Sequence, residues 1–208
     1  MRKFPSEDAV HDIFADDYDS LTLQLENHAH EVIFGLVFEY TNPGDKLLDL
    51  GIGTGLGSYL FHKAGLSIYG LDNSKEMLDI CRKKDISQDL KLFDIKESHL
   101  PYDNQVFDQI ISVGVFHFFH DLDRFFKETH RILKEGGIFS FTVKDSGTLV
   151  SREVNEEYDM VIYGHSKEYV VELSQKYDFK ILKNLNFTSF KDQSKKESLS
   201  FKAYVLEK

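Results

Sequence analysis

Apolar and polar positions along this chain follow two periods. Short apolar runs predict strands, and stripes spaced by three or four residues predict helices. Five runs with strand character follow one another through the middle of the chain, and segments with helical spacing separate most of them. These runs are 46–50, 66–72, 90–93, 107–112 and 138–143. Strands that alternate with helices favour an α/β fold, with a mostly parallel, doubly wound sheet covered by helices on both faces.

The pattern changes at both ends of the chain. Residues 6–18 and 25–40 place apolar side chains at helical spacing, which predicts an N-terminal helical cap. Residues 144–165 have no clear period, and we interpret them as a loop with a short helix that covers a substrate. Residues 179–190 and 199–207 alternate enough to predict two antiparallel strands after a helix that Ser166 caps.

Composition indicates a globular and acidic protein. Hydrophobic residues make up 41% of the 208 positions, which excludes a disordered chain. The net charge of −10 provides no long-range attraction to phosphate backbones or anionic lipid, so no nucleic-acid partner is expected. The single cysteine, Cys81, excludes an intrachain disulfide. No apolar leader and no 18-residue apolar run are present, so we expect a cytoplasmic protein without a membrane partner.

The most informative segment joins the first predicted strand to a helix. Asp49 lies near the end of that strand, and Gly51, Gly53 and Gly55 follow at alternate positions. Glycine allows a backbone to approach a ligand closely and to adopt a positive φ. The next helix points its unpaired N–H groups at the same place. The segment therefore predicts a ligand-binding turn, and a tight turn without any ligand is the alternative.

Two common ligands do not fit this turn. A nucleoside-triphosphate loop needs a lysine after its last glycine, and no lysine or arginine lies between Lys46 and Lys63. A dinucleotide fingerprint needs Gly-x-Gly-x-x-Gly or Ala. Counted from Gly51, the last position of this fingerprint is Leu56, and counted from Gly53 it is Ser58. The register is therefore wrong for a nicotinamide dinucleotide.

The turn resembles the first motif of class I S-adenosyl-L-methionine-dependent methyltransferases, in which an acid ends the strand and Gly-x-Gly-x-Gly follows. That ligand carries an ammonium and a sulfonium, which suit an acidic neighbourhood. The resemblance covers roughly residues 40–145 and includes the run 131–137, which is similar to a recurring methyltransferase segment. It implies a Rossmann-like sheet of seven strands, five of them parallel and the last two a C-terminal antiparallel hairpin.

A second acid follows the glycine turn at the end of the next strand. Asp72 lies 21 residues after Gly51 and is placed to accept both hydroxyls of a ribose. Asp72, Ser74 and Met77 match the Asp-x-Ser-x-x-Met pattern of the family. The resemblance implies Asp72 on the ribose, Met77 against the adenine ring and Asn73 in the same binding turn. Taken alone, these residues are a helix cap and a core methionine.

The resemblance also assigns residues after the third and fourth strands. Asp94 follows the third strand directly, where the family places an acid that receives the adenine amino group. The backbone N–H of Ile95 is expected to meet the same ring. Ser112 and Val113, at the end of the fourth strand, are expected to touch the cofactor by their backbone.

Methyl transfer from a sulfonium needs alignment more than a fixed set of catalytic groups. His117 follows the strand that the resemblance places beside the methyl group, and it is the candidate general base. A packed position between two phenylalanines is the alternative. The spacing of His117 to His120, Asp121 and Asp123 matches no standard zinc site, so we expect no metal.

Three tyrosine and histidine side chains outside the motifs are further candidates. Tyr18, followed by Asp19, resembles an N-terminal Tyr-Asp pair that closes over the cofactor in related enzymes, and a buried tyrosine at a helix end is the alternative. Tyr163 and His165 are candidates for the wall of a substrate site.

These patterns together predict a single methyltransferase domain. Its parts are a helical cap at 1–40, a cofactor-binding core at 41–145, and a lid with the C-terminal hairpin at 146–208. The expected activity is transfer of a methyl group from S-adenosyl-L-methionine to a small-molecule acceptor. Alternatives are a protein side chain as acceptor, a catalytically silent cofactor-binding module, and an NAD(P)-dependent oxidoreductase.

Overall fold

The computed structural model describes residues 15–97, 99–155, 160–192 and 197–208. The helices are η1 (Ala15–Asp17), α2 (Tyr18–Gln24), α3 (Ala29–Val37), η2 (Phe38–Tyr40), α4 (Tyr59–Lys63), α5 (Lys75–Lys83), η3 (Phe116–Phe118), α6 (Asp123–Ile132) and α7 (Lys167–Lys176). The strands are β1 (Lys46–Leu50), β2 (Ser67–Asp72), β3 (Asp89–Leu92), β4 (Phe107–Ser112), β5 (Leu133–Asp145), β6 (Val150–Asn155), β7 (Met160–His165), β8 (Lys180–Asp192) and β9 (Glu197–Glu207).

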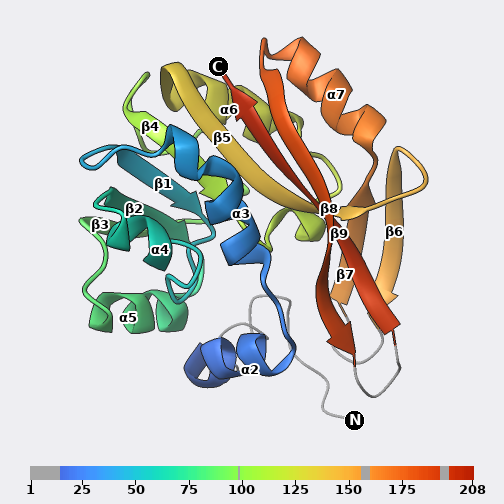
Figure 1. The fold of residues 1–208 in the computed structure, drawn as a ribbon, viewed down its shortest axis with the longest axis horizontal. Coiled ribbons are helices and arrows are strands. Elements are labelled where there is room, and N and C mark those ends of the chain that lie inside the picture. The colour runs from blue at the N-terminus through green and yellow to red at the C-terminus, as the bar shows by residue number, and fades with distance from the viewer. Residues whose placement is uncertain (1–14, 98, 156–159, 193–196) are drawn as a thin grey trace.

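The strands form one sheet, whose nine members in the described residues outnumber the seven expected. The predicted parallel part is confirmed, with β3, β2, β1, β4 and β5 side by side in that order. The predicted C-terminal hairpin is also confirmed, because β9 pairs antiparallel with β5 and with β8. Figure 1 shows these two long strands crossing the molecule in red. The additional strands are β6 and β7.

The prediction of a loop with a short helix at 144–165 was wrong. Strands β6 and β7 form an antiparallel hairpin, and β7 pairs in parallel with the last two residues of β5. Strand β5 is 13 residues long, so its end extends past its pairing with β4, which stops at Phe141, and offers that edge to β7. Both hairpin strands are largely half-buried or exposed, so no apolar alternation marked them in the sequence.

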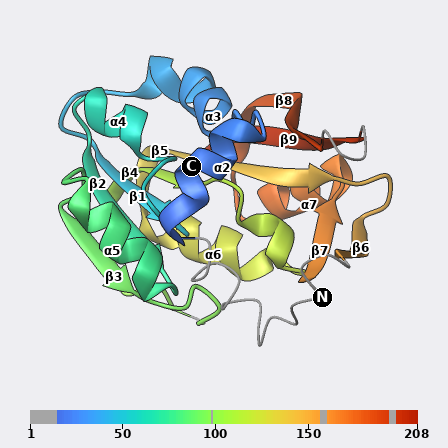
Figure 2. The ribbon, with the colours of Figure 1, turned by 90° about the horizontal axis from the view of Figure 1, so that it is seen from below.

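Two hydrophobic cores lie on opposite faces of the sheet. Side chains of successive strand residues point to opposite faces. Leu47 of β1 therefore packs in the core beneath α3, α4 and α5, and its neighbour Leu48 packs in the core beneath α6 and α7. Figure 2 shows α3 and α4 on one side of the sheet and α6 on the other. This double layer is the doubly wound arrangement that the sequence predicts.

The helices agree with the sequence in part. The predicted helix at 6–18 lies mostly outside the described residues, and Tyr18 begins α2 instead of ending a helix. The helix after the glycine turn is short, only Tyr59–Lys63. The predicted caps are confirmed, since Ser74 Oγ and Ser166 Oγ each accept a backbone N–H three residues later, at 3.2 Å. Within the described ranges, none of the helices combines the length and apolar character needed to cross a membrane.

Candidate active site

Two adjoining cavities lie at the carboxyl ends of the parallel strands. The first has a volume of about 110 Å³ and is lined by residues that follow β2, β3 and β4; we call it the β2 cavity. The second has a volume of about 240 Å³ and includes side chains of β5; we call it the β5 cavity. Their shared wall consists of Tyr18, Gly51, Gly53, Val113, Gly114 and Phe118. A ligand in one cavity can therefore reach the other past the glycine turn.

The glycine turn has a backbone that side chains would not permit. The N–H groups of Gly51 and Ile52 both donate to the Leu71 carbonyl, at 2.8 and 3.1 Å, which holds the turn against β2. Gly51 has a φ of +80°, and a Cβ there would lie 2.5 Å from Val115 Cγ2. Gly53 has a φ of +53° and lines both cavities. Glycine is therefore required for the conformation at both positions and for space at the first.

Two of the predicted cofactor contacts lie outside the walls of both cavities. A Cβ on Gly55 would lie 2.8 Å from Cys81 Sγ and from Ile86 Cδ1, so this glycine permits packing of the turn on α5. Ser112 is fully buried, and its hydroxyl donates to the Leu50 carbonyl at 3.1 Å. Neither residue lines a cavity. Their positions indicate that they support the site from behind.

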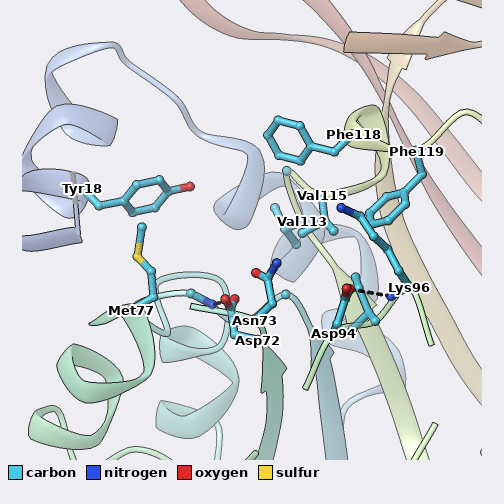
Figure 3. Close-up of a pocket in the computed structure, with 14 residues that line it drawn as sticks. Tyr18, Asp72, Asn73, Met77, Asp94, Lys96, Val113, Val115, Phe118 and Phe119 are labelled. Carbon is cyan, nitrogen blue, oxygen red and sulfur yellow. Dashed lines mark hydrogen bonds between the residues drawn. The ribbon is translucent and has the colours of Figure 1, made fainter. Parts of the chain in front are cut away.

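Asp72 joins the glycine turn to α5 and faces the β2 cavity. One carboxylate oxygen accepts the N–H of Gly53 at 2.7 Å, and the other accepts the N–H of Ser74 at 2.9 Å. The carboxylate therefore fixes the glycine turn and the start of α5 relative to each other. Asn73 and Met77 line the same cavity, and Figure 3 shows Tyr18 and Met77 opposite each other at one end of it.

Asp49 is a buried acid beside the glycine turn. Asp49 is 2% exposed and lines the β5 cavity. One of its carboxylate oxygens accepts a hydrogen bond from the Ser58 hydroxyl at 2.7 Å. Burial raises the pKa of this carboxyl to about 7, against the Ser58 hydrogen bond, and the negative charge of Asp72 raises it further. A cationic ligand group near Asp49 would favour its carboxylate form.

The far end of the β2 cavity is made by the segment after β3. Asp94 is exposed, and its side chain accepts the N–H of Lys96 at 2.8 Å (Figure 3). Ile95 is buried, and its carbonyl accepts a hydrogen bond from Arg124 at 2.7 Å. Phe119 completes this end together with Lys96, and the sequence motifs marked neither of the two.

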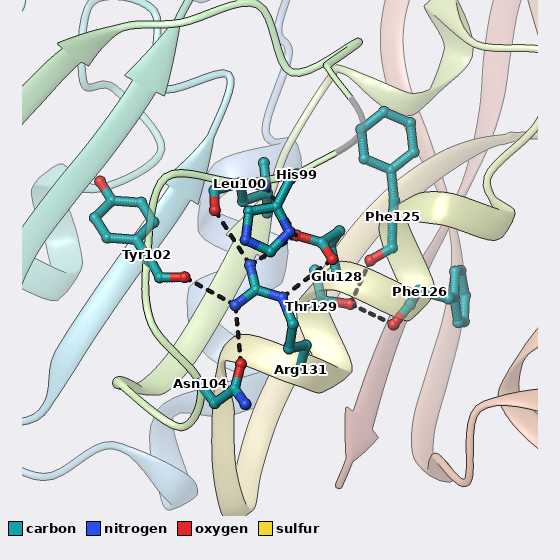
Figure 4. A network of polar contacts seen from close by, with 9 residues as sticks. All are labelled: His99, Leu100, Tyr102, Asn104, Phe125, Phe126, Glu128, Thr129 and Arg131. Atoms are coloured by element: carbon teal, nitrogen blue, oxygen red, sulfur yellow. Dashed lines mark hydrogen bonds and ion pairs between the residues drawn. The ribbon is translucent and has the colours of Figure 1, made fainter.

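A polar network fixes the chain that follows this segment (Figure 4). The Arg131 guanidinium binds both oxygens of Glu128, at 3.1 and 2.7 Å. It also donates to the carbonyls of Leu100 and Tyr102 and to the side chain of Asn104. Glu128 in turn accepts the N–H of Leu100 at 2.8 Å. Residues 100–104 are therefore held to α6 by Glu128 and Arg131. Arg131 begins the run 131–137 that resembles a recurring methyltransferase segment.

The N-terminal helix α2 covers both cavities. Tyr18 lines each of them, and burial together with the charges of Asp19 and Asp72 raises its pKa. Asp19 accepts the hydroxyl of Thr54 in the glycine turn at 2.5 Å and forms an ion pair with Lys84 at the end of α5. This pair of contacts holds α2 over the carboxyl ends of the strands.

The β5 cavity brings together side chains that are far apart in the sequence. The ring of His117 lies 4.1 Å from that of Phe118 and 5.6 Å from that of Phe201, measured between centroids. The hydroxyl of Thr142 accepts the N–H of Gly114 at 2.9 Å. Lys144 and His30 are buried polar residues on the same wall. His117 thus lies where a ligand of this cavity would meet it.

The substrate-wall assignment of Tyr163 and His165 does not fit the structure. His165 is fully buried and stacked on Tyr169, and burial lowers its pKa to about 4. Tyr163 packs against the ring of His120, and neither residue lines a cavity. Because β7 is a strand, neighbouring side chains point to opposite faces, and it is Ile162 that lines the β5 cavity.

All of the other predicted site residues line these cavities, but several lining residues were missed. The β2 cavity contains Tyr18, Gly51, Gly53, Asp72, Asn73, Met77, Asp94, Ile95 and Val113, and the β5 cavity contains Asp49 and His117. The missed residues include Thr142, Lys144, Leu199 and Phe201, which no local motif marks. Across the described parts of the chain, no group of three or more metal-binding side chains comes together.

Comparisons with known proteins agree with this geometry. Residues 48–141 match the family described as a methyltransferase domain. A demethylmenaquinone methyltransferase of Lactobacillus johnsonii is 36% identical over 150 residues, which cover 65% of this chain and 60% of that protein. A malonyl-[acyl-carrier protein] O-methyltransferase of Serratia marcescens is 29% identical over 147 residues, which cover 71% of this chain and 55% of that protein. The chain spans about half the length of the curated relatives that it matches.

A solved structure shows the same fold at lower identity. The 1,6-didemethyltoxoflavin-N1-methyltransferase of Burkholderia thailandensis, with 1,6-didemethyltoxoflavin and S-adenosylhomocysteine bound, has a TM-score of 0.73 and 16% identity. The alignment covers 96% of this chain and 87% of that protein. Residues 48–141 therefore match a methyltransferase domain in sequence, and the chain shares its fold with a methyltransferase whose structure contains S-adenosylhomocysteine.

Proposed function

We propose that this protein binds S-adenosyl-L-methionine across the two cavities and transfers its methyl group to a small-molecule acceptor. The observation that carries the proposal is the shared wall at Gly51, Gly53 and Val113. If the nucleoside of the cofactor lies in the β2 cavity, its methyl-bearing sulfonium extends past this wall. An acceptor in the β5 cavity then approaches the methyl group from the other side. A silent binding module would not need the second cavity.

The residues of the β2 cavity and the turn fit this cofactor. Asp72 places a carboxylate on the wall of the β2 cavity, a group that accepts hydrogen bonds from a ribose diol, and Gly51 and Gly53 leave room for close approach. Asp94 and Ile95 lie at the far end, where the Asp94 carboxylate can accept a hydrogen bond from an adenine amino group and the Ile95 N–H can donate one to the ring. The raised pKa of Asp49 fits a carboxyl whose charge is completed by the ammonium of the ligand.

The protein has two tasks beyond binding this cofactor. When bound, S-adenosyl-L-methionine supplies a methyl group that is already activated on a sulfonium, so alignment of the acceptor contributes most of the rate. The apolar walls formed by Phe118, Ile162 and Phe201 hold the acceptor and exclude water. His117 on the same wall is the side chain best placed to take a proton from the acceptor.

The size of the β5 cavity and the relatives support a small molecule as acceptor. The cavity has a volume of about 240 Å³ and is lined by residues of α2, α3, β5, β7 and β9, which suits a small ligand better than a protein side chain on a folded partner. A demethylmenaquinone methyltransferase and a 1,6-didemethyltoxoflavin-N1-methyltransferase are among the similar proteins. The glycine register argues against the nicotinamide-dependent oxidoreductase.

Calorimetric titration tests the cofactor assignment. The purified protein is titrated with S-adenosyl-L-methionine, with S-adenosylhomocysteine, and with oxidised nicotinamide dinucleotide as control. Saturable binding of the first two ligands alone is the expected result. Binding of the dinucleotide alone would assign the turn to an oxidoreductase, and binding of none would remove the proposal.

Variants of two nearby histidines test the role of His117. With an acceptor in hand, His117→Asn is expected to lower the methyl-transfer rate by about 10²–10⁴-fold and to remove the acidic limb of its pH profile. His120→Asn is the matched control, because His120 is exposed and lines neither cavity. Equal rates and equal pH profiles for the two variants would limit His117 to packing.

A further inference from the structure

The β5 cavity contains a buried cation that the methyl-transfer proposal does not use. Lys144 lies at the end of β5 and is only 8% exposed. Among the described residues that line this cavity, it is the one lysine or arginine. Lysine is rarely buried unless its ammonium is paired, because removing the charge from water is costly. The position therefore calls for an anion beside it.

The anion that the structure provides is displaceable. The ammonium of Lys144 forms an ion pair with Glu153 of β6. The side chain of Lys144 is 10% exposed, whereas that of Glu153 is 58% exposed. Glu153 thus remains mostly hydrated outside the cavity, and leaving the pair returns it to water at little cost. An anion that enters the cavity can take its place.

The surroundings of Lys144 indicate the rest of the ligand. In the sheet Lys144 is opposite Phe201 of β9, and opposite residues place their side chains on the same face. Phe201, Phe118 and Ile162 give the cavity that Lys144 lines an apolar wall, and Thr142 and His117 line the same cavity. A ligand with an apolar body and one negative group matches this arrangement.

We propose that Lys144 is the recognition site for a carboxylate on the acceptor, so that the acceptor is a small organic acid with an apolar body. This inference rests on the proposed function, because it assigns a substrate class to the same cavity. The carboxylate replaces Glu153 on the ammonium of Lys144, and the apolar body lies against the aromatic wall. The chain has a net charge of −10, which disfavours an anionic acceptor, and the ammonium of Lys144 compensates for this locally.

A second buried lysine provides a matched control. Lys202 of β9 is also 8% exposed, and it pairs with Asp145 at 3.0 Å. It is opposite Val143 in the sheet, so its side chain lies on the other face from Lys144, and it lines neither cavity. Removing either lysine deletes a buried charge of the same kind, but only Lys144 faces the acceptor.

The test uses the full chain saturated with S-adenosylhomocysteine and two pairs of probes, octanoate with octanamide and benzoate with benzamide. Calorimetry is expected to show that the wild type binds the acids and that Lys144→Met binds them about 10- to 100-fold more weakly. Affinity for the amides, and for S-adenosylhomocysteine itself, is expected to stay the same in the variant. Lys202→Met is expected to bind the acids as the wild type does.

A third variant tests the exchange of partners. Glu153→Gln removes the competing carboxylate from Lys144 and is expected to tighten binding of the acids several-fold, which a purely structural role of the ion pair would not cause. Acids that bind no better than amides, or not at all, or equally well to Lys144→Met, would overturn this inference while S-adenosylhomocysteine still binds. If the wild type does not bind S-adenosylhomocysteine, the proposed function fails first.

Discussion

The two cavities of this protein are built in different ways. The β2 cavity is lined mainly by short segments that directly follow the parallel strands, and backbone groups hold it, as in the two N–H groups that Asp72 accepts. The β5 cavity is lined by side chains from α2 to β9, with Lys144 and Phe201 brought together by strand pairing. A site for a shared cofactor can rest on the backbone, whereas a site for a particular acceptor depends on side chains from distant segments.

The largest difference is expected in how substitutions near each cavity change the free energy of unfolding. Arg131→Met leaves the carboxylate of Glu128, whose side chain is 9% exposed, with only the Leu100 N–H and the exposed His99 as partners, and it frees residues 100–104 behind the β2 cavity. We expect a loss of about 3–5 kcal/mol in the free energy of unfolding, measured by urea titration. Lys144→Met on the β5 side is expected to change it little, because Glu153 returns to water. Similar losses of unfolding free energy in Arg131→Met and Lys144→Met would contradict the expected difference between the two cavities.

The second prediction concerns pH. The folded pKa of Asp49, about 7, lies above its unfolded value of 3.8, so the folded protein binds more protons than the unfolded chain between these values. Without ligand, the contribution of Asp49 to stability is therefore expected to fall as pH rises from about 4 to about 7, by on the order of 4 kcal/mol in total. Urea midpoints across this range measure the slope. Asp49→Asn is expected to flatten it, and an unchanged slope in that variant would assign the proton to another group.

The third prediction concerns cofactor affinity. Asp72→Ala removes a charged acceptor from the β2 cavity and from the glycine turn, so binding of S-adenosyl-L-methionine is expected to weaken by about 1.5–3 kcal/mol. Calorimetry measures the change. Asp79→Ala is the control, because Asp79 on α5 pairs with Lys75 and Arg82 on the surface. An affinity of Asp72→Ala equal to that of the control would remove the ribose assignment.

The smallest effect is expected where the two cavities meet. Asp19→Ala breaks the contacts of α2 with Thr54 and Lys84, which are a buried hydroxyl and a partly exposed ion pair. Cofactor binding is expected to weaken by about 1 kcal/mol, since α2 must then be ordered by the ligand. Asp16→Ala, an exposed substitution in η1, is the control for the same calorimetric measurement. Equal affinities of the two variants would show that the contacts of Asp19 do not affect cofactor binding.

The local pattern of the chain predicted the β2 side well. The strands between 46 and 143 could be recognised in the sequence, and their parallel arrangement follows from alternation with helices. The acids at their ends, Asp49, Asp72 and Asp94, line the cavities because parallel strands end at one edge of the sheet. Gly55 and Ser112 line neither of the two cavities, since a motif gives position along the chain but not which side of the backbone faces the cavity.

The hairpin β6–β7 was missed because a half-exposed strand has no apolar alternation, and its pairing depends on the far end of β5. That error carried over to the substrate wall, where Ile162 replaces Tyr163 and His165. Strand alternation cannot be applied to residues that are not recognised as a strand.

By itself the sequence determined the layer order, the glycine turn and the acids around it, because these depend on local backbone conformation and on short apolar periods. Only the tertiary structure decided the β5 cavity. Lys144 and Phe201 are 57 positions apart in the sequence, and the pairing of β5 with β9 brings them together beside Ile162. Such contacts arise from long-range strand pairing and burial on one face of the sheet, which no local pattern encodes.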